Sequence, residues 1–419
     1  MEKAIIIGVN TLSETHVFLD EIKELENLCL ACDIEVIDVI TQNLNNIISA
    51  TYVGKGKIDE IKIAIDSLDA EALVFNDELT PSQINNLQEA LEITIYDRTF
   101  IILEIFKRRA KTREAILQVE IATLKYSLPR LVGLREGLSR QRGVGGGGTA
   151  RGRGIGETKL ELDRRVTNDR ISALKNELED LTILRKQQRK TRKTNNMQTV
   201  CLVGYTNSGK SSILNAVLNR SKGIKKEVFQ KDMLFATLET ATRAIQTEAN
   251  FRFLLTDTVG FVNKLPHQLV EAFKSTLEEI TEADLIVHVV DATNSNYKLQ
   301  IETTNKVLQS IGVSNIPTIY AFNKIDLVED YLYIQPEYVK AIRTSATEDK
   351  NIDTLITMIQ KELEHDFISV KINVPYKDQE VIEFLKDNGY VTKIDYQETK
   401  IEVSAKLPER LLSKIEKYK

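Results

Sequence analysis

The sequence GYTNSGKS at residues 204–211 decides how the second half of the chain folds. It is a complete G-x-x-x-x-G-K-S motif that directly follows the apolar run TVCLV (199–203) and opens the run SSILNAVLN (211–219). A strand, a glycine-rich turn and a helix in this order surround phosphates with backbone N–H groups and the helix N-terminus. We expect Lys210 to reach the β- and γ-phosphates and Ser211 to ligate Mg²⁺. The chain is therefore expected to bind a nucleoside triphosphate.

A second motif stands at the end of another apolar run. The stretch FRFLLTD (251–257) reads as a strand and ends in Asp257-Thr258-Val259-Gly260. A carboxylate at this strand end can hold a magnesium-bound water, and the backbone N–H of Gly260 can donate to the γ-phosphate. D-x-x-G alone is a weak signal, and its order and spacing after the phosphate loop make it informative. Gly260 is expected to sense whether the terminal phosphate is present.

A third motif, NKID at 323–326, follows the apolar run PTIYAF and selects the base. The Asp326 carboxylate can accept from both N1–H and N2–H of guanine, whereas adenine offers no matching donors. Lys324 would lie along the base, and Asn323 would tie this loop to the phosphate loop. Further on, the backbone N–H groups of Ser345 and Ala346 would reach guanine O6. The three motifs in this order predict GTP.

The stretch LFATLETATR (234–243) lies between the first two motifs and supplies a switch threonine. We expect Thr237 to close over Mg²⁺ and the γ-phosphate. The competing Thr240 and Thr242 lie nearer the start of the next strand and would be less free to move.

Two residues bear on the rate of hydrolysis. Phe261 follows Gly260 at the position where Ras-like enzymes carry the glutamine that orients the attacking water. A phenyl ring cannot polarise water, so slow intrinsic hydrolysis, accelerated by a partner, is predicted. Asn207 could ligate K⁺ in place of an arginine finger, or it could simply hydrogen-bond within its own loop.

These motifs define a candidate GTP site. The catalytic candidates are Lys210, Thr237 and Gly260. The Mg²⁺ candidates are Ser211, Thr237 and, through a water, Asp257. The residues expected to contact GTP are Gly204, Tyr205, Thr206, Asn207, Ser208, Gly209, Lys210, Ser211, Phe235, Ala236, Thr237, Leu238, Glu239, Asp257, Thr258, Val259, Gly260, Asn323, Lys324, Asp326, Thr344, Ser345 and Ala346.

The 419 residues are enough for several domains of the α/β class. We expect a small α/β domain at 1–100, a basic helical hairpin at 101–195, a P-loop GTPase domain at 196–366 and a small α+β domain at 367–419. In the first of these, apolar runs alternate with amphipathic runs, which predicts a parallel or mixed sheet. The expected strands are 4–8, 34–40, 71–75 and 93–97, and the expected helices are 14–32, 57–68 and 81–91, the last with Thr80 as N-cap and Pro81 at its first position.

The hairpin is predicted from two helical stretches, at about 99–128 and 157–193. In the second stretch, a/d spacing favours antiparallel packing on the first. Between them, GVGGGGTARGRGIG (143–156) has 8 Gly in 14 residues. This loop is either a flexible connector or a cationic finger that orders against RNA phosphates. The apolar seam would be Ile171, Leu174, Leu178 and Leu181, and the candidate rRNA-binding residues are Arg140, Arg142, Arg151 and Arg153.

The charge of the chain is unevenly distributed. The net charge is −5, but residues 107–193 hold 23 Lys and Arg against 10 Asp and Glu, a local +13 that leaves −18 elsewhere. A basic segment inside an acidic protein is typical of a polyanion-binding insert, because each Lys or Arg that neutralises a phosphate releases counterions. A solvated helical face with i,i+4 pairs is the alternative.

Composition narrows the class of protein. The chain is 42% hydrophobic and 28% charged, which is typical of a globular protein. No apolar run is long enough to span a membrane, and we do not expect a secretory signal in MEKAIIIGVN (1–10), which lacks a basic start and a cleavage pattern. The three cysteines are too few for a disulfide framework, and the Cys29–Cys32 spacing favours core packing over a redox pair. We expect a cytoplasmic protein without integral membrane association.

The ordered set GYTNSGKS, LFATLE, DTVGF, NKID and TSA resembles the Obg–HflX branch of translation-factor-like GTPases. The upstream stretches TYVGKGKIDEI (51–61), VFNDELTPSQINNLQ (74–88), YDRTFIILEIFKRRAKTREAILQVEIATLKYSLPRL (96–131) and GETKLELDRR (156–165) resemble hallmarks of the HflX family. The resemblance therefore covers nearly the whole chain.

The resemblance implies a GTPase that acts as a cytoplasmic monomer and binds the large ribosomal subunit, not DNA. Its hairpin and glycine loop would approach the rRNA of the peptidyl-transferase region, and it would separate stalled ribosomes under stress. Family members usually read R-G-P-G-E-T at the positions of residues 153–158, where this chain has Ile155 in place of the proline. Some members also bind ATP through the amino-terminal region. In this chain the stretch GKGK (54–57) of that region lacks phosphate-loop spacing. An ATP-dependent RNA-remodelling factor and a nucleotide-gated scaffold are the alternative functions.

Overall fold

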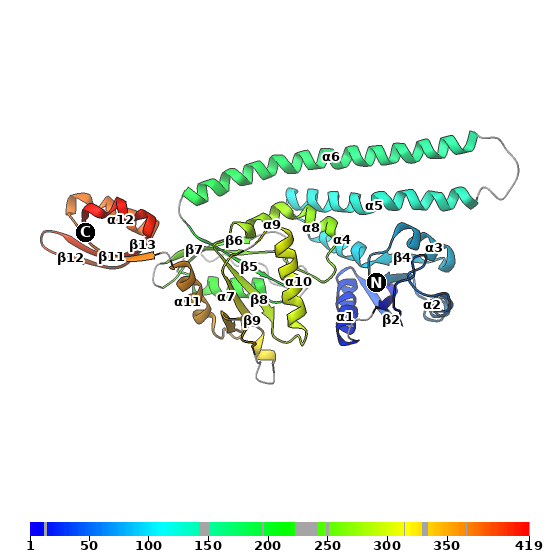
Figure 1. Cartoon of the computed structure of the whole chain (residues 1–419), viewed down its shortest axis with the longest axis horizontal. Coiled ribbons are helices and arrows are strands. Elements are labelled where there is room, and N and C mark those ends of the chain that lie inside the picture. Colours follow the sequence, from blue (N-terminus) through cyan, green and yellow to red (C-terminus); the bar gives the residue numbers. More distant parts are fainter. Residues whose placement is uncertain are drawn as a thin grey trace. The chain divides into compact units, whose positions relative to one another are not determined.

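The chain forms two compact units, which we describe separately (Figure 1). Unit 1 holds the described residues of Met1–Leu181 together with Asn263–Phe273, and unit 2 holds the remaining described residues. The computed structural model describes residues 1–11, 15–141, 151–194, 197–222, 241–248, 251–313, 315–328, 334–365 and 367–418.

Unit 1 is built on a four-stranded parallel sheet with the strand order β2-β1-β3-β4. Alternate residues of β1, including Ile5 and Ile7, form one core with apolar residues of α2 and α3. The predicted strands and helices are confirmed, and Thr80 caps α3 in a capping box with Gln83. The elements are β1 (Glu2–Asn10), α1 (Thr15–Ala31), β2 (Ile34–Asn43), α2 (Lys55–Leu68), β3 (Ala72–Phe75), α3 (Pro81–Leu91) and β4 (Thr94–Asp97).

The hairpin consists of α5 (Arg113–Gln141) and α6 (Arg151–Thr194), which run side by side (Figure 1). The predicted seam is confirmed, because Ile171 and Leu174 are buried against Leu117 and Ile121 of α5. Exposed ion pairs flank it and join Arg113 to Glu177 and Arg170 to Glu120.

Three predicted boundaries in this region are wrong. A division at residue 100 falls inside α4 (Arg98–Arg109), which starts directly after β4 because Asp97 caps it. The first hairpin helix does not end near 128 but continues past Pro129 to Gln141, and the Arg130 guanidinium donates to the Tyr126 carbonyl at 2.7 Å. The predicted loop 143–156 overlaps α6 by six residues. Extending an existing helix costs less free energy than starting one, even through glycines.

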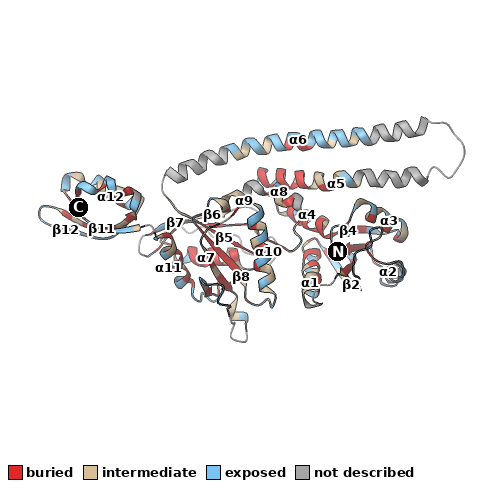
Figure 2. Ribbon diagram, viewed as in Figure 1, coloured by how far each residue is buried: buried red, intermediate tan, exposed pale blue. Residues whose placement is uncertain are grey.

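Unit 2 contains a six-stranded sheet with the order β10-β9-β8-β5-β7-β6, in which only β6 is antiparallel to its neighbour. Helices α7 and α11 pack on one face and α10 on the other, and buried residues follow the central strands (Figure 2). The elements are β5 (Thr199–Gly204), α7 (Lys210–Arg220), β6 (Ala241–Gln246), β7 (Arg252–Asp257), α9 (Lys274–Thr281), β8 (Leu285–Asp291), α10 (Tyr297–Ser310), β9 (Thr318–Asn323), β10 (Ala341–Arg343) and α11 (Ile352–Leu363).

The last part of the chain has its own antiparallel sheet, β11-β13-β12, formed by Phe367–Val374, Ile401–Pro408 and Tyr390–Tyr396. Helix α12 (Glu380–Asn388) covers it, and short 3-10 turns follow β13. The Tyr390 ring also joins the core of the larger sheet.

Candidate guanine-nucleotide site

The GYTNSGKS loop connects β5 to the N-terminus of α7, as its sequence predicts. Gly209 has a φ of +90°, and a Cβ there would lie 2.2 Å from Nδ2 of Asn323. Only glycine fits this position, because the loop needs both a left-handed backbone and close approach to the NKID loop.

Lys210 is buried inside the loop that it belongs to. Its Nζ donates to the carbonyl oxygens of Gly204 at 3.1 Å and Tyr205 at 2.7 Å. Burial lowers the pKa of Lys210 to about 8, although the nearby Asp257 carboxylate acts in the opposite direction. The ammonium is thus held over the loop, where an anionic ligand would offset its loss of hydration.

Ser211 and Asp257 meet at the adjoining ends of α7 and β7. The Ser211 hydroxyl donates to Oδ2 of Asp257 at 2.6 Å, and the Thr258 hydroxyl donates to the carbonyl of Leu202 at 2.6 Å, which fixes the start of the DTVG loop. A hydroxyl and a carboxylate are oxygen donors that suit Mg²⁺. In the described part of the chain, no group of three or more His, Cys, Asp or Glu could hold a metal ion. The pair fits a magnesium ion that takes its other ligands from phosphates and water.

The DTVG loop lies against the phosphate loop. The N–H of Thr206 donates to the carbonyl of Phe261 at 2.6 Å, and the N–H of Phe261 donates to the carbonyl of Gly204 at 3.2 Å. A Cβ at Gly260 would lie 2.8 Å from Cα of Thr206 and 3.1 Å from Nζ of Lys210. The Phe261 side chain is buried. The Phe261 carbonyl therefore accepts from one N–H of the phosphate loop, and Gly260 lies close to the loop and to Lys210.

Asn323 joins the NKID loop to the phosphate loop, as predicted. Its Nδ2 donates to the carbonyl of Ser208 at 3.0 Å, and its Oδ1 accepts from the N–H of Ala346 at 3.1 Å. The Lys324 ammonium lies 2.7 Å from a carboxylate oxygen of Asp291, a partner that the sequence motifs do not identify. Among the described residues, Oδ1 of Asp326 is buried and has no hydrogen-bond partner. This geometry leaves a carboxylate oxygen ready to accept from a base.

Some predicted site residues lie outside the described structure. These are Phe235, Ala236, Thr237, Leu238 and Glu239 of the switch stretch. Arg142 lies outside it as well, and of Arg140, Arg151 and Arg153 only the helical backbone is described. Their predicted roles stay predictions.

Three protein families match successive parts of the chain. Residues 19–107 match the family described as "GTP-binding GTPase N-terminal", and residues 109–192 match "GTP-binding GTPase Middle Region". Residues 199–324 match the family described as "50S ribosome-binding GTPase". The GTPase HflX of Caldanaerobacter subterraneus subsp. tengcongensis is 42% identical over 98% of this chain and 93% of its own. The GTPase HflX of Escherichia coli K12 is 38% identical over 79% of this chain and 74% of its own. The crystal structure of a GTP-binding protein from Sulfolobus solfataricus in complex with GDP is 25% identical in sequence. The match covers 86% of this chain and 98% of that protein, with a TM-score of 0.44.

The phosphate loop, the DTVG and NKID loops and the sheet that carries them define a P-loop GTPase, an enzyme that hydrolyses GTP. The Caldanaerobacter relative matches it along nearly its whole length, and family matches cover the amino-terminal sheet and the hairpin. The chain belongs to the HflX family of GTPases. None of the helices in the described ranges has the length and apolar character needed to cross a membrane.

Proposed function

We propose that this GTPase is a molecular switch that binds the large ribosomal subunit and dissociates or rescues stalled ribosomes. The observation that carries the proposal is the local charge of +13 on residues 107–193, which form most of the hairpin. The match of residues 199–324 to a 50S ribosome-binding GTPase supports the same partner. A polycationic arm beside an acidic remainder favours docking on rRNA in one orientation.

In this proposal the candidate site works as follows. Lys210 and the phosphate-loop amides bind the triphosphate, and Asp326 with Lys324 binds guanine. Ser211, Asp257 through a water, and Thr237 hold Mg²⁺, which neutralises phosphate charge during hydrolysis.

Hydrolysis is slow without the ribosome, because Phe261 is buried and has no group that could orient water. A comparison of hydrolysis in KCl and NaCl tests whether Asn207 uses K⁺. We also propose that the protein acts as a monomer in the cytoplasm.

Sucrose gradients test the ribosomal role. Ribosomes are mixed with the protein and GTP, a nonhydrolysable analogue, GDP or ATP. The proposal expects the intact-ribosome peak to shrink and the protein to sediment with the large subunit when the analogue is bound. Unchanged peaks and no co-sedimentation would refute it, and an effect with ATP alone would favour an RNA-remodelling ATPase.

Charge reversal of the arm tests the contact. A variant with Arg151→Glu and Arg153→Glu should bind large subunits more weakly, and the slope of log affinity against log salt should fall by about 2. The matched control reverses two exposed lysines of α2 in the same unit, Lys55→Glu and Lys62→Glu. Equal losses in both variants would show that total charge matters and that the arm does not.

A further inference from the structure

The residues after the DTVGF motif leave unit 2 and are built into unit 1. Val262 and Lys274 belong to unit 2, whereas Asn263–Phe273 between them belongs to unit 1. Asn263 is three residues beyond Gly260. The loop that would sense the terminal phosphate is therefore joined by a very short connection to the unit that carries most of the hairpin.

Lys264 and Asn263 anchor this segment to unit 1. The Lys264 ammonium lies 2.7 Å from Oε2 of Glu21 on α1 and 2.7 Å from Oδ1 of Asp77, just after β3. Nδ2 of Asn263 donates to the other Glu21 oxygen at 2.8 Å. All of the charged side chains in this cluster are at least partly removed from solvent, where charge-assisted hydrogen bonds are stronger than at a surface.

The two acceptor carboxylates are themselves held in place. The hydroxyl of the buried Tyr52 donates to Asp77, and the N–H of Val9 donates to the same hydroxyl at 3.3 Å. Nδ2 of Asn76 donates to Glu21 at 3.2 Å. Lys264 thus binds to a prearranged pair of carboxylates, one on α1 and one just after β3.

The far end of the segment rests on the base of the hairpin. Helix α8 (His267–Ala272) packs on α5, with a 2.7 Å ion pair between Glu271 and Lys125. The ring of Phe273 lies 5.1 Å, centroid to centroid, from that of Phe106 on α4. Movement of the segment would therefore reach the helices that support the cationic arm.

Phosphate binding at the candidate site would disturb the start of this segment. The N–H of Thr206 donates to the carbonyl of Phe261, and a Cβ at Gly260 would lie 3.1 Å from Nζ of Lys210. A terminal phosphate bound by Lys210 and by the Gly260 N–H would have to fit beside this contact. Its binding would shift the backbone at Gly260 and Phe261, and Phe261 is two residues before Asn263.

We infer that Lys264 is a positioning residue that transmits the state of the nucleotide to unit 1 by clamping the segment after DTVGF onto Glu21 and Asp77. The inference rests on the proposed function for its ribosomal consequence. A ligand shifts an equilibrium only through its different affinities for two states, and the clamp makes the contacts of the segment with Glu21 and Asp77 one of the differences between those states. Without the clamp, phosphate would still displace Phe261, but α1 and the residues after β3 would no longer follow, and only the contacts of α8 and Phe273 would remain.

The test compares Lys264→Met with Lys264→Arg and with Lys57→Met, which removes an ion pair to Glu60 elsewhere in unit 1. Affinity for large subunits is measured with the nonhydrolysable GTP analogue and with GDP. The ratio of the affinity with the analogue to the affinity with GDP should fall about 5-fold or more in Lys264→Met. Lys264→Arg and the control Lys57→Met should keep the wild-type ratio. GDP affinity, measured with a fluorescent nucleotide, should stay within about 2-fold, because Lys264 is outside the site.

A second readout needs no ribosome. Hydrogen exchange of α1 and of residues 72–80 should differ between the analogue and GDP in the wild type. In Lys264→Met this difference should vanish, while the difference in residues 204–211 remains. Asp77→Asn removes one charge and keeps the shape of the side chain, so it should reduce the exchange difference in α1 only partially.

An unchanged affinity ratio in Lys264→Met, or a surviving exchange difference in α1, overturns the inference, as does a wild type whose α1 never responds. A wild type that ignores ribosomes but shows the exchange response would refute the proposed function and leave the clamp standing.

Discussion

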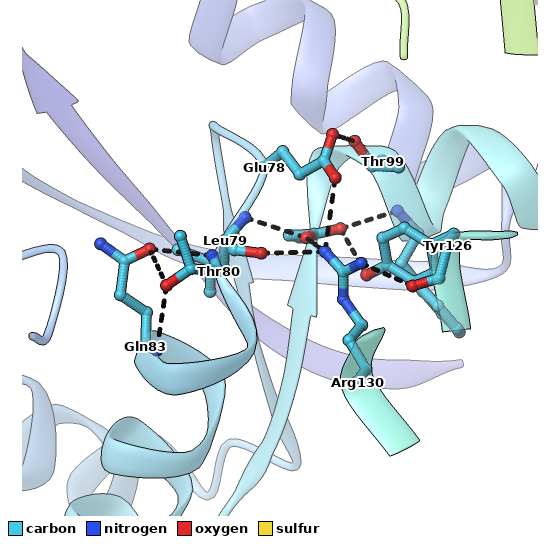
Figure 3. A network of polar contacts seen from close by, with 9 residues as sticks. Glu78, Leu79, Thr80, Gln83, Thr99, Tyr126 and Arg130 are labelled. Carbon is cyan, nitrogen blue, oxygen red and sulfur yellow. Dashed lines mark hydrogen bonds and ion pairs between the residues drawn. The ribbon is translucent and has the colours of Figure 1, made fainter. Parts of the chain in front are cut away.

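Replacing Arg130 by methionine should destabilise the base of the hairpin, because Arg130 is the counter-charge of the fully buried Asp97 carboxylate. Oδ2 of Asp97 accepts from Arg130 at 3.1 Å and from the N–H of Leu79 at 3.0 Å. Oδ1 accepts from the N–H of Phe100 and the hydroxyl of Tyr126, both at 2.8 Å. The Arg130 guanidinium also lies 3.4 Å from the centroid of the Tyr126 ring (Figure 3).

The loss of stability in Arg130→Met depends on the hydrogen-bond donors that remain around the Asp97 carboxylate. Removing one member of a buried ion pair costs about 3–5 kcal/mol. Three neutral donors remain on Asp97 and the Arg130 side chain is 13% exposed, so we expect a value near the lower end, about 3 kcal/mol.

The loss should depend on pH. Burial raises the pKa of Asp97, and Arg130 pulls it down, so the variant should have a still higher pKa. A carboxyl with a raised folded-state pKa contributes stability below its unfolded pKa and loses it as the pH rises through the folded pKa. The variant should therefore be most destabilised at pH 8 and less so as the pH falls toward 5.

Hydrogen exchange in a urea series, read on peptides from α3 to α5, measures the local free energy of opening. It is preferable to a global melt, because two units need not unfold together. The control is Arg170→Met, whose 2.9 Å pair with Glu120 is solvent-exposed and worth about 0–1 kcal/mol. The reasoning fails if Arg130→Met lowers the local free energy of opening by no more than the control does. It also fails if the loss of free energy is the same at pH 8 and pH 5.

Three further predictions concern the nucleotide site. Asp326→Asn should weaken GTP binding about 10- to 100-fold and improve binding of xanthosine triphosphate, since a hydrogen bond to a charged group is worth about 1.5–3 kcal/mol; competition titration measures both. Gly209→Ala should weaken GTP and GDP alike, because its Cβ would lie 2.2 Å from Nδ2 of Asn323, and fluorescent-nucleotide binding checks this. GTP affinity should fall as the pH rises above about 8, the pKa of Lys210, because only the protonated amine attracts phosphate, and a pH series that stays flat to pH 9.5 would contradict it.

Local patterns in the sequence predicted where the phosphate loop and the NKID loop lie in the fold. The GYTNSGKS and NKID loops follow apolar strands, so their places at the sheet edge follow from chain order. The link from Asn323 to the phosphate loop was predictable for the same reason. The seam at Ile171 and Leu174 was predictable from heptad spacing.

Contacts between residues distant in sequence were not predictable. Lys264 and Glu21 are 243 residues apart, and no periodicity or motif relates them. The pair of Lys324 with Asp291 is missed for the same reason, although an acid at the end of β8 is a usable signal once the sheet order is known. The start of α6 at Arg151 was missed because the glycines of 143–156 were weighed as loop formers, without the helix beyond them.

The two polar networks of unit 1 meet at neighbouring residues. Asp97 closes β4 and holds Tyr126 and Arg130 of α5. Arg98 opens α4 and is also buried, and it donates to Oδ1 of Asn76 at 2.9 Å and pairs with Glu24 of α1. Because one peptide bond joins the two, the α1 side and the α5 side of the sheet share a rigid, densely packed junction.

This junction gives the two variants distinct consequences. Lys264 reaches α1 through Glu21, and the hairpin base lies beyond Arg98 and Asp97. Lys264→Met should therefore remove the nucleotide-dependent change in hydrogen exchange from α1 and reduce it in α5, where the contacts of α8 remain. Arg130→Met breaks only the link to α5, so it should keep the change in α1 and reduce it in α5. If Arg130→Met leaves the response of α5 intact, the coupling runs instead through the contact of α8 with α5 or through that of Phe273 with Phe106.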